Sequence, residues 1–111
     1  MACTYTLTCT PHEAADRIHD AIECGSLTGE LIDRYTISAG ERVCMTLTWE
    51  KHYYRAGNRL TLTAVIDDLS GVTRVHLIGG GGGEGLFGFD WGASDSFEQS
   101  ALNALRDVMQ P

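Results

Sequence analysis

Glu50, His52 and His76 are the residues whose types and spacing come closest to a chemical site in this sequence. Histidine titrates near neutrality and a nearby carboxylate can orient it, so these side chains together can act as acid and base. Two histidines and a carboxylate can also hold zinc. A hydrolase or metal-binding protein built on the three residues is therefore one hypothesis, and it is the least favoured of three.

The position of these residues follows from a predicted hairpin. Residues 43–53 carry apolar side chains at odd positions, broken only by Lys51, whereas residues 60–66 carry them at even positions. Because directly opposed residues share a face of the sheet, the change of parity predicts a loop of two or four residues. We pair Glu50 with Thr63 and His52 with Thr61. The candidate ligand-binding face then consists of Glu50, His52, Tyr54, Thr61, Thr63 and, from the next strand, His76.

Five consecutive glycines form the most unusual segment: Gly79, Gly80, Gly81, Gly82 and Gly83. A phosphate-binding loop needs a lysine followed by a serine or threonine after its glycines, but Glu84 follows here. We therefore interpret the run as a mobile loop, or as a bulged strand end that allows a close backbone approach.

Other reactive side chains have structural explanations. The four cysteines are spaced too irregularly for a zinc ribbon or a redox pair, so buried thiols are expected at Cys3, Cys9, Cys24 and Cys44. The sequence contains no HExxH or GxSxG motif. We predict no catalytic residue, no metal and no cofactor.

Charge narrows the classes of partner. The chain has 15 acidic and 8 basic residues, which give a net charge of −7. Binding to duplex nucleic acid needs a cationic surface, so neither nucleic acid nor an anionic membrane is an expected partner. No apolar stretch approaches the roughly 20 residues that span a bilayer, and the N-terminus lacks the pattern of a secretory signal. We predict one cytoplasmic domain, residues 1–111.

The first two elements have clear local signals. Residues 3–9 alternate between apolar and threonine side chains, which predicts a strand. Thr10 then precedes Pro11, and Glu13 follows three residues after Thr10, which is the capping-box pattern that begins a helix. Gly25 is expected to end this helix.

Further strands are predicted within residues 26–38 and at 43–53, 60–66 and 74–78, with a short strand at 86–91 and a helix from Asp95. The order is β-α-β-β-β-β-(β)-α. Short turns imply an antiparallel meander of five or six strands, and two amphipathic helices imply that both cover one face. The predicted fold class is α+β with two layers.

Residues 49–62 read Trp-Glu-Lys-His-Tyr-Tyr-Arg-Ala-Gly-Asn-Arg-Leu-Thr-Leu, and a glycine-rich segment and Trp91-Gly92-Ala93 follow. This combination resembles a family of small uncharacterised bacterial proteins, a domain of unknown function, over most of residues 41–105. The family has a Gly-Gly-Ser loop where this chain has five glycines. The resemblance implies a bacterial, cytosolic protein, but it implies no activity and no catalytic residue.

The leading hypothesis is a non-enzymatic binding or self-association domain, such as a homodimer, that uses the threonine-rich sheet face or an exposed edge strand. The alternative is a helix-grip-like protein that binds a small molecule between sheet and helices. Lys51 or Tyr35 would stand at the rim of that pocket. Its lining would be the aromatic residues Trp49, Tyr53, Phe87, Phe89, Trp91 and Phe97.

Overall fold

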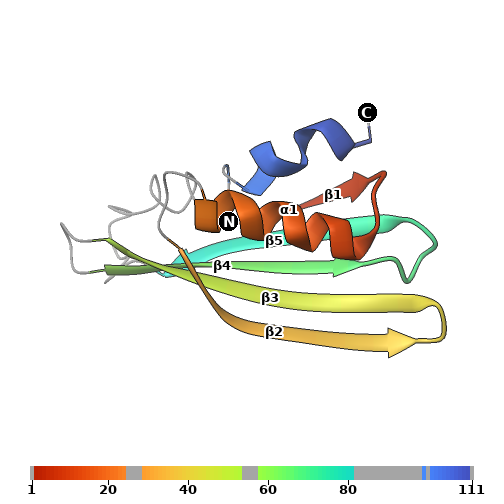
Figure 1. Cartoon of the computed structure of the whole chain (residues 1–111), viewed down its shortest axis with the longest axis horizontal. Coiled ribbons are helices and arrows are strands. Elements are labelled where there is room, and N and C mark those ends of the chain that lie inside the picture. The colour runs from red at the N-terminus through yellow and green to blue at the C-terminus, as the bar shows by residue number, and fades with distance from the viewer. Residues whose placement is uncertain (1, 25–28, 54–57, 82–98, 100, 111) are drawn as a thin grey trace.

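The computed structural model describes residues 2–24, 29–53, 58–81, 99 and 101–110, which form an antiparallel sheet with helices on one face (Figure 1). Its elements are β1 (Ala2–Leu7), α1 (Pro11–Cys24), β2 (Glu30–Ala39), β3 (Arg42–Tyr53), β4 (Asn58–Asp67), β5 (Thr73–Gly81) and the 3₁₀ turn η1 (Arg106–Val108). Residues 101–105 are helical and lead into η1. The α+β class and the predicted order of elements are confirmed. The predicted strand at 86–91 and the helix start at Asp95 lie outside the described residues.

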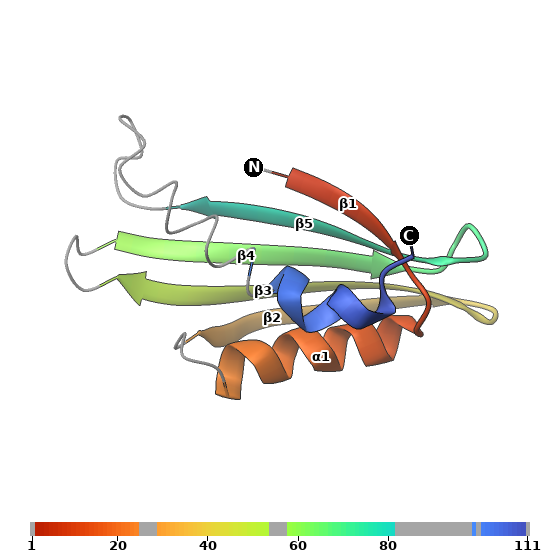
Figure 2. The same cartoon turned by 90° about the horizontal axis from the view of Figure 1, so that it is seen from above.

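The five strands lie in the order β1-β5-β4-β3-β2, and all neighbours are antiparallel (Figure 2). β2 to β5 form the predicted meander, and β1 pairs with β5. Among the described strands, β1 and β2 are therefore the edges of the sheet. Gly40 begins the two-residue turn between β2 and β3 with a φ of 64°, which that position of a tight hairpin requires.

Local capping chemistry starts α1 where the sequence predicts it. The hydroxyl oxygen of Thr10 accepts the N–H of Glu13 at 3.2 Å. The carboxylate of Glu13 binds Arg17 Nε at 3.2 Å, and Arg17 Nη1 also lies 2.9 Å from Oδ1 of Asp107, which is part of η1. The helix ends at Cys24, next to Gly25, which lies outside the described residues.

One hydrophobic core lies between the sheet and the helices. α1 contacts β2, β3, β4 and β5, and residues of the C-terminal helix belong to the same buried cluster. This confirms that both helices cover one sheet face, as the two views show (Figures 1 and 2). The core includes Leu7, Ile18, Ile22, Met45, Leu47, Trp49, Leu62, Ile66, Leu77 and Leu105. Lys51 shares this face at the end of β3, and burial lowers the pKa of its ammonium group.

The hairpin register differs from the prediction by two residues. Glu50 lies opposite Thr61, and His52 lies opposite Arg59. Odd residues still pair with even ones and four residues still separate Tyr53 from Asn58. A shift of two residues changes neither the sheet face nor the loop length, so the parity argument cannot detect it.

The glycine run continues β5 for three residues. Gly79, Gly80 and Gly81 lie opposite Leu62, Thr61 and Leu60 in an unbroken ladder, so the prediction of a loop or bulge is wrong for these three positions. A Cβ on Gly80 would lie 3.5 Å from Thr61 Oγ1, an ordinary contact. Gly82 and Gly83 lie outside the described residues. Within the described part of the chain, none of the helices combines the length and the apolar character needed to cross a membrane.

Candidate functional site

The sheet face that points away from the helices holds part of the predicted ligand-binding face. Glu50 and Thr61 are direct neighbours across β3 and β4, and Thr63 lies opposite Thr48 with their hydroxyl oxygens 3.3 Å apart. All four side chains are partly exposed. The structure therefore brings Glu50, Thr61 and Thr63 together. The side chain of His52 and the whole of Tyr54 lie outside the described residues.

His76 does not join this group. It lies opposite Val65 on β4 and Thr4 on β1, and the Thr4 hydroxyl is 2.6 Å from His76 Nδ1. The residue of β5 beside Thr61 is Gly80. His76 is therefore about 13 Å away along the strands and about 10 Å across two strands from Glu50. Among the described side chains, no three histidine, cysteine or acidic residues gather in a way that could hold a metal ion.

The predicted small-molecule pocket finds little support in the described aromatic residues. Trp49 is fully buried in the core, and its indole N–H donates to His19 Nδ1 at 3.3 Å. Tyr35 is 61% exposed and pairs with Thr46 on the opposite face of the sheet from the helices. Its placement at the rim of a helix–sheet pocket is therefore wrong. The aromatic residues at 87, 89, 91 and 97 lie outside the described residues.

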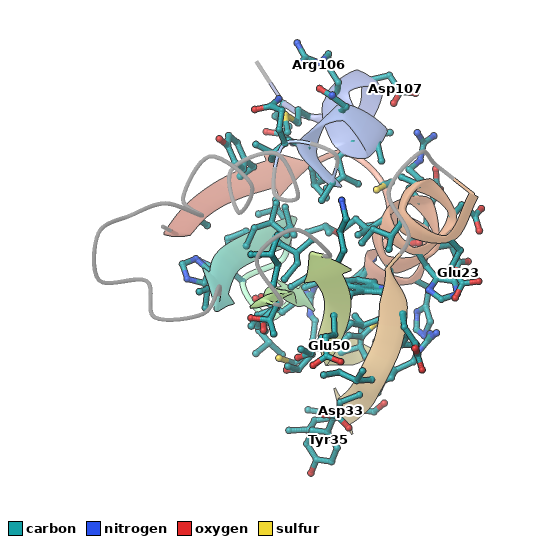
Figure 3. The ribbon with its side chains drawn as sticks, turned by 90° about the vertical axis from the view of Figure 1, so that its left-hand side faces the viewer. Glu23, Asp33, Tyr35, Glu50, Arg106 and Asp107 are labelled. Carbon is teal, nitrogen blue, oxygen red and sulfur yellow. The ribbon has the colours of Figure 1, made fainter. Side chains whose placement is uncertain are left out.

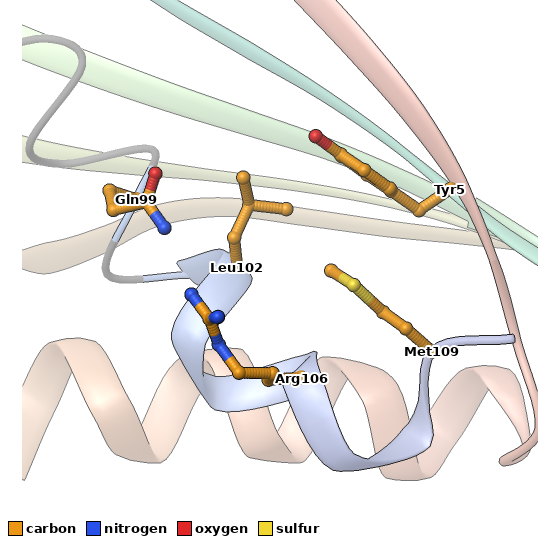
Figure 4. A pocket seen from close by; sticks show the side chains of 5 residues that line it. All are labelled: Tyr5, Gln99, Leu102, Arg106 and Met109. Atoms are coloured by element: carbon orange, nitrogen blue, oxygen red, sulfur yellow. The ribbon is translucent and has the colours of Figure 1, made fainter. Parts of the chain in front are cut away.

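A shallow groove does lie between β1 and the C-terminal helix (Figure 4). Its volume is about 230 Å³, and it is lined by Tyr5, Gln99, Leu102, Arg106 and Met109. Small-molecule sites usually measure about 300–1,000 Å³ and bury most of the ligand. This open groove is smaller than that range.

The β1 edge of the sheet is covered at its Leu7 end by the C-terminal segment. The N–H of Thr8 donates to the Val108 carbonyl at 2.7 Å, and the N–H of Gln110 donates to the Thr6 carbonyl at 2.9 Å. Leu7 and Met109 form an antiparallel bridge between these two bonds. Residues 108–110 therefore occupy the place of a further strand.

The β2 edge is exposed over nearly its whole length. Of its ten residues only Leu31 is partly buried; the other nine are exposed. Tyr35 and Ile37, at 61% and 52% exposure, lie on the face away from the helices. The side chains of Asp33 and Tyr35 project from this edge (Figure 3). Exposed large apolar residues are therefore concentrated on an edge strand, where partner strands can pair.

Hydrogen bonds of the neighbouring strand show which groups of β2 point outward. The N–H of Val43 donates to Asp68 Oδ1 at 2.8 Å, and its carbonyl accepts the N–H of Asp68 at 3.2 Å. Both main-chain groups of Val43 thus point away from β2. Ser38, its partner in the ladder, must then direct its own N–H and carbonyl to the outside.

The alternation of an antiparallel ladder extends this result to Thr36 and Arg34. Ile32 has no partner in β3, because a bulge interrupts the register between Leu31 and Asp33. The regular part of the edge therefore runs from Asp33 to the turn after Ala39. It offers three outward residues, Arg34, Thr36 and Ser38.

The β2 edge was not predicted from the sequence, although a signal was present. Residues 26–38 show no clean alternation of apolar and polar side chains. A strand with one buried face alternates, whereas a strand exposed on both faces has no reason to. Arg34, Thr36 and Ser38 share the helix side of the sheet with buried residues of β3, yet all three are exposed.

Comparisons with known proteins agree with the resemblance seen in the sequence. A family model described as a family of unknown function, DUF6054, matches residues 1–109. Neither the comparison with curated proteins nor the comparison with solved structures gave a match. The expectation of a family of unknown function is confirmed.

Proposed function

We propose that this chain, which belongs to the family of unknown function DUF6054, is a non-enzymatic binding domain that adds an extended polypeptide segment to the edge of β2. The observation that carries the proposal is the contrast between the two edges. The C-terminal segment pairs with the Leu7 end of β1, whereas nine of the ten residues of β2 are exposed.

Main-chain hydrogen bonds would supply much of the binding free energy. The outward N–H and carbonyl groups of Arg34, Thr36 and Ser38 repeat at the spacing of an antiparallel ladder. Tyr35 and Ile37 lie between them and add apolar surface on one face. Cross-strand pairs of aromatic and β-branched residues each contribute about 0.2–1 kcal/mol. A partner strand with such residues at alternate positions therefore fits this edge.

The charge of the protein restricts the partner further. The net charge is −7, and Glu30 lies opposite Glu50 near the start of β2. An acidic segment would be repelled, whereas an uncharged segment with basic ends would be attracted. The chemistry of the expected partner is thus an extended segment with β-branched residues and no net negative charge.

Fluorescence polarisation tests this proposal with a labelled probe peptide of alternating threonine and valine that has lysine at both ends. We expect saturable binding to the full chain. Thr36→Pro removes an outward N–H without removing a bond to β3, and proline is tolerated at such edge positions. This variant should weaken probe binding at least tenfold.

Two controls separate strand addition from nonspecific attraction. Thr36→Val keeps the N–H and should bind the probe like the unchanged protein. A probe with proline at alternate positions cannot form the ladder and should not bind. Equal binding by Thr36→Pro and Thr36→Val would contradict the proposal, because the β2 main chain would then not be used.

A small-molecule carrier is the second candidate, and the groove beside Arg106 favours it. The apolar groups of Leu102 and Met109 and the guanidinium of Arg106 suit a small amphipathic anion. However, the groove volume of about 230 Å³ is below the usual range for small-molecule sites. Strand addition at β2 is therefore the preferred function. Ligand retained on native mass spectrometry and lost in Arg106→Ala would reverse this preference.

A further inference from the structure

We infer that the strand added to β2 is the β2 of a second copy of this chain, paired antiparallel about a two-fold axis at Thr36. This inference rests on the proposed function of the β2 edge. Homo-oligomers with two-fold symmetry are common, and such an interface pairs one surface with itself. The observations that carry the inference are the register, the outward groups and the charges of β2.

The boundaries of the regular strand select the register. The bulge ends regular pairing before Asp33, and the turn at Gly40 ends it after Ala39. Thr36 is the midpoint of this stretch. Two copies that overlap over the whole stretch must therefore pair Thr36 with the partner's Thr36.

The outward hydrogen-bonding groups agree with the same centre. With Thr36 on the axis, Arg34 lies opposite the partner's Ser38, and Ser38 lies opposite the partner's Arg34. Each of the three pairs joins two residues whose N–H and carbonyl groups point outward. All three outward residues are then used, and about six hydrogen bonds form, two for each pair. A shift by two residues in either direction leaves outward groups in the bulge or the turn.

Side chains and charges are complementary in this register. Tyr35 lies opposite the partner's Ile37, and the symmetry repeats this aromatic–aliphatic pair. The stretch from 33 to 39 has one acidic and one basic residue, so it is neutral in a chain of net charge −7. Asp33 lies opposite the partner's Ala39, and no like charges oppose each other. The repulsion between two copies is therefore weak along this segment.

The resulting dimer has one continuous sheet. The axis is perpendicular to the sheet, so the helices of both copies lie on the same side. The interface consists of main-chain bonds and a few side chains, which places it at the small end of specific interfaces. We therefore expect a dissociation constant in the micromolar range, on the order of 1–100 μM.

Cysteine cross-linking of the full chain tests the partner and the register together. In the proposed dimer, the two Cα atoms at position 36 are about 5.5 Å apart, which suits a disulfide. The corresponding atoms at position 38 are separated by about 13 Å along the strands. Thr36→Cys should give a disulfide-linked dimer under mild oxidation. Ser38→Cys, on the same face of the sheet and also exposed, should not.

Wild-type protein oxidised in parallel gives the background from the native cysteines, and native mass spectrometry reports the subunit count. Tyr35→Cys, Ile37→Cys and Ser38→Cys report registers shifted to either side. A cross-link at position 36 alone supports the inference. A dimer cross-linked best at another position overturns this register.

The oligomeric state and probe binding together distinguish a wrong dimer from a wrong binding edge. A protein that stays monomeric at 500 μM, about five times the weakest expected dissociation constant, overturns the inference. If that monomer still binds the threonine–valine probe through Thr36, the proposed function stands. If probe binding is also absent, both proposals are wrong.

Discussion

β1 and β2 are the two edge strands of the same sheet, but their outward main-chain groups meet different surroundings. At β1, Thr6 and Thr8 pair with the C-terminal segment. At β2, the described part of the chain places no strand beside Arg34, Thr36 and Ser38. β1 has six residues and β2 has ten. The longer edge is thus the open one, although exposed edges promote pairing with other chains.

The difference teaches where a fold can acquire a binding surface. The covered edge shares residues with the core, since Leu7 and Val108 are both buried. The open edge contributes mostly exposed side chains. Substitution of these side chains therefore changes the free energy of unfolding little. Natural proteins usually protect long edges with charge, proline or bulges. β2 has its bulge and its charges near one end only, which leaves 35–39 uncharged.

The largest expected effect is on the free energy of unfolding. It is seen when a buried residue of one edge and an exposed residue of the other are each replaced by alanine. Leu7→Ala should lower the free energy of unfolding by about 2–5 kcal/mol, because a large side chain is removed from the core. Ile37→Ala should change it by less than about 1 kcal/mol. Urea denaturation at low protein concentration measures both. Similar losses for the two variants would mean that β2 is not energetically separate from the core.

Proline substitutions at the two edges should also lower the free energy of unfolding by different amounts, but the difference should be smaller. Thr8→Pro removes the N–H that donates to the Val108 carbonyl at 2.7 Å, which costs about 1–3 kcal/mol. Thr36→Pro removes an N–H that points outward, so the monomer should lose less stability. Denaturation of the two variants side by side tests this order. The reverse order would contradict the assignment of outward groups on β2.

Amide hydrogen exchange should sharpen the comparison without a mutation. In dilute protein, the N–H groups of Thr36 and Ser38 should exchange at least about tenfold faster than those of Thr8 and Gln110, which are hydrogen-bonded. At high concentration, pairing of two copies should slow exchange at Arg34, Thr36 and Ser38 but not at Thr8 and Gln110. Protection that is independent of concentration would exclude the proposed dimer as its cause.

The smallest predicted effect concerns Cys9, next to the covered edge. Burial, and then the nearby carboxylate of Glu13, raise the pKa of its thiol. Less thiolate is therefore present at pH 8 than for a free cysteine, so alkylation of Cys9 should be slower and should keep rising above pH 9. Glu13→Gln should lower the pKa and increase the rate by less than tenfold, since burial is the larger cause. Mass spectrometry of the Cys9 peptide measures both rates.

Features that depend on neighbours in the sequence were predicted well. Thr10 and Glu13 locate the start of α1, and the alternation within 43–53 and 60–66 identifies the buried face of β3 and β4. The position of His76 relative to Glu50, and the choice of edge strands, could not be predicted from neighbouring residues. His76 is separated from Glu50 because β5 pairs with β4 in a register that places Gly80 beside Thr61.

The sequence by itself determined the elements, the faces that they bury and the α+β class, because side chains a few residues apart decide helix and strand periodicity. Only the tertiary structure decided that β1 pairs with β5, that residues 108–110 cover its edge, and that β2 remains open. These pairings join residues up to about a hundred positions apart, as Thr8 and Val108 illustrate. Main-chain groups pair without regard to residue type, so no local pattern identifies the distant segment that covers the β1 edge.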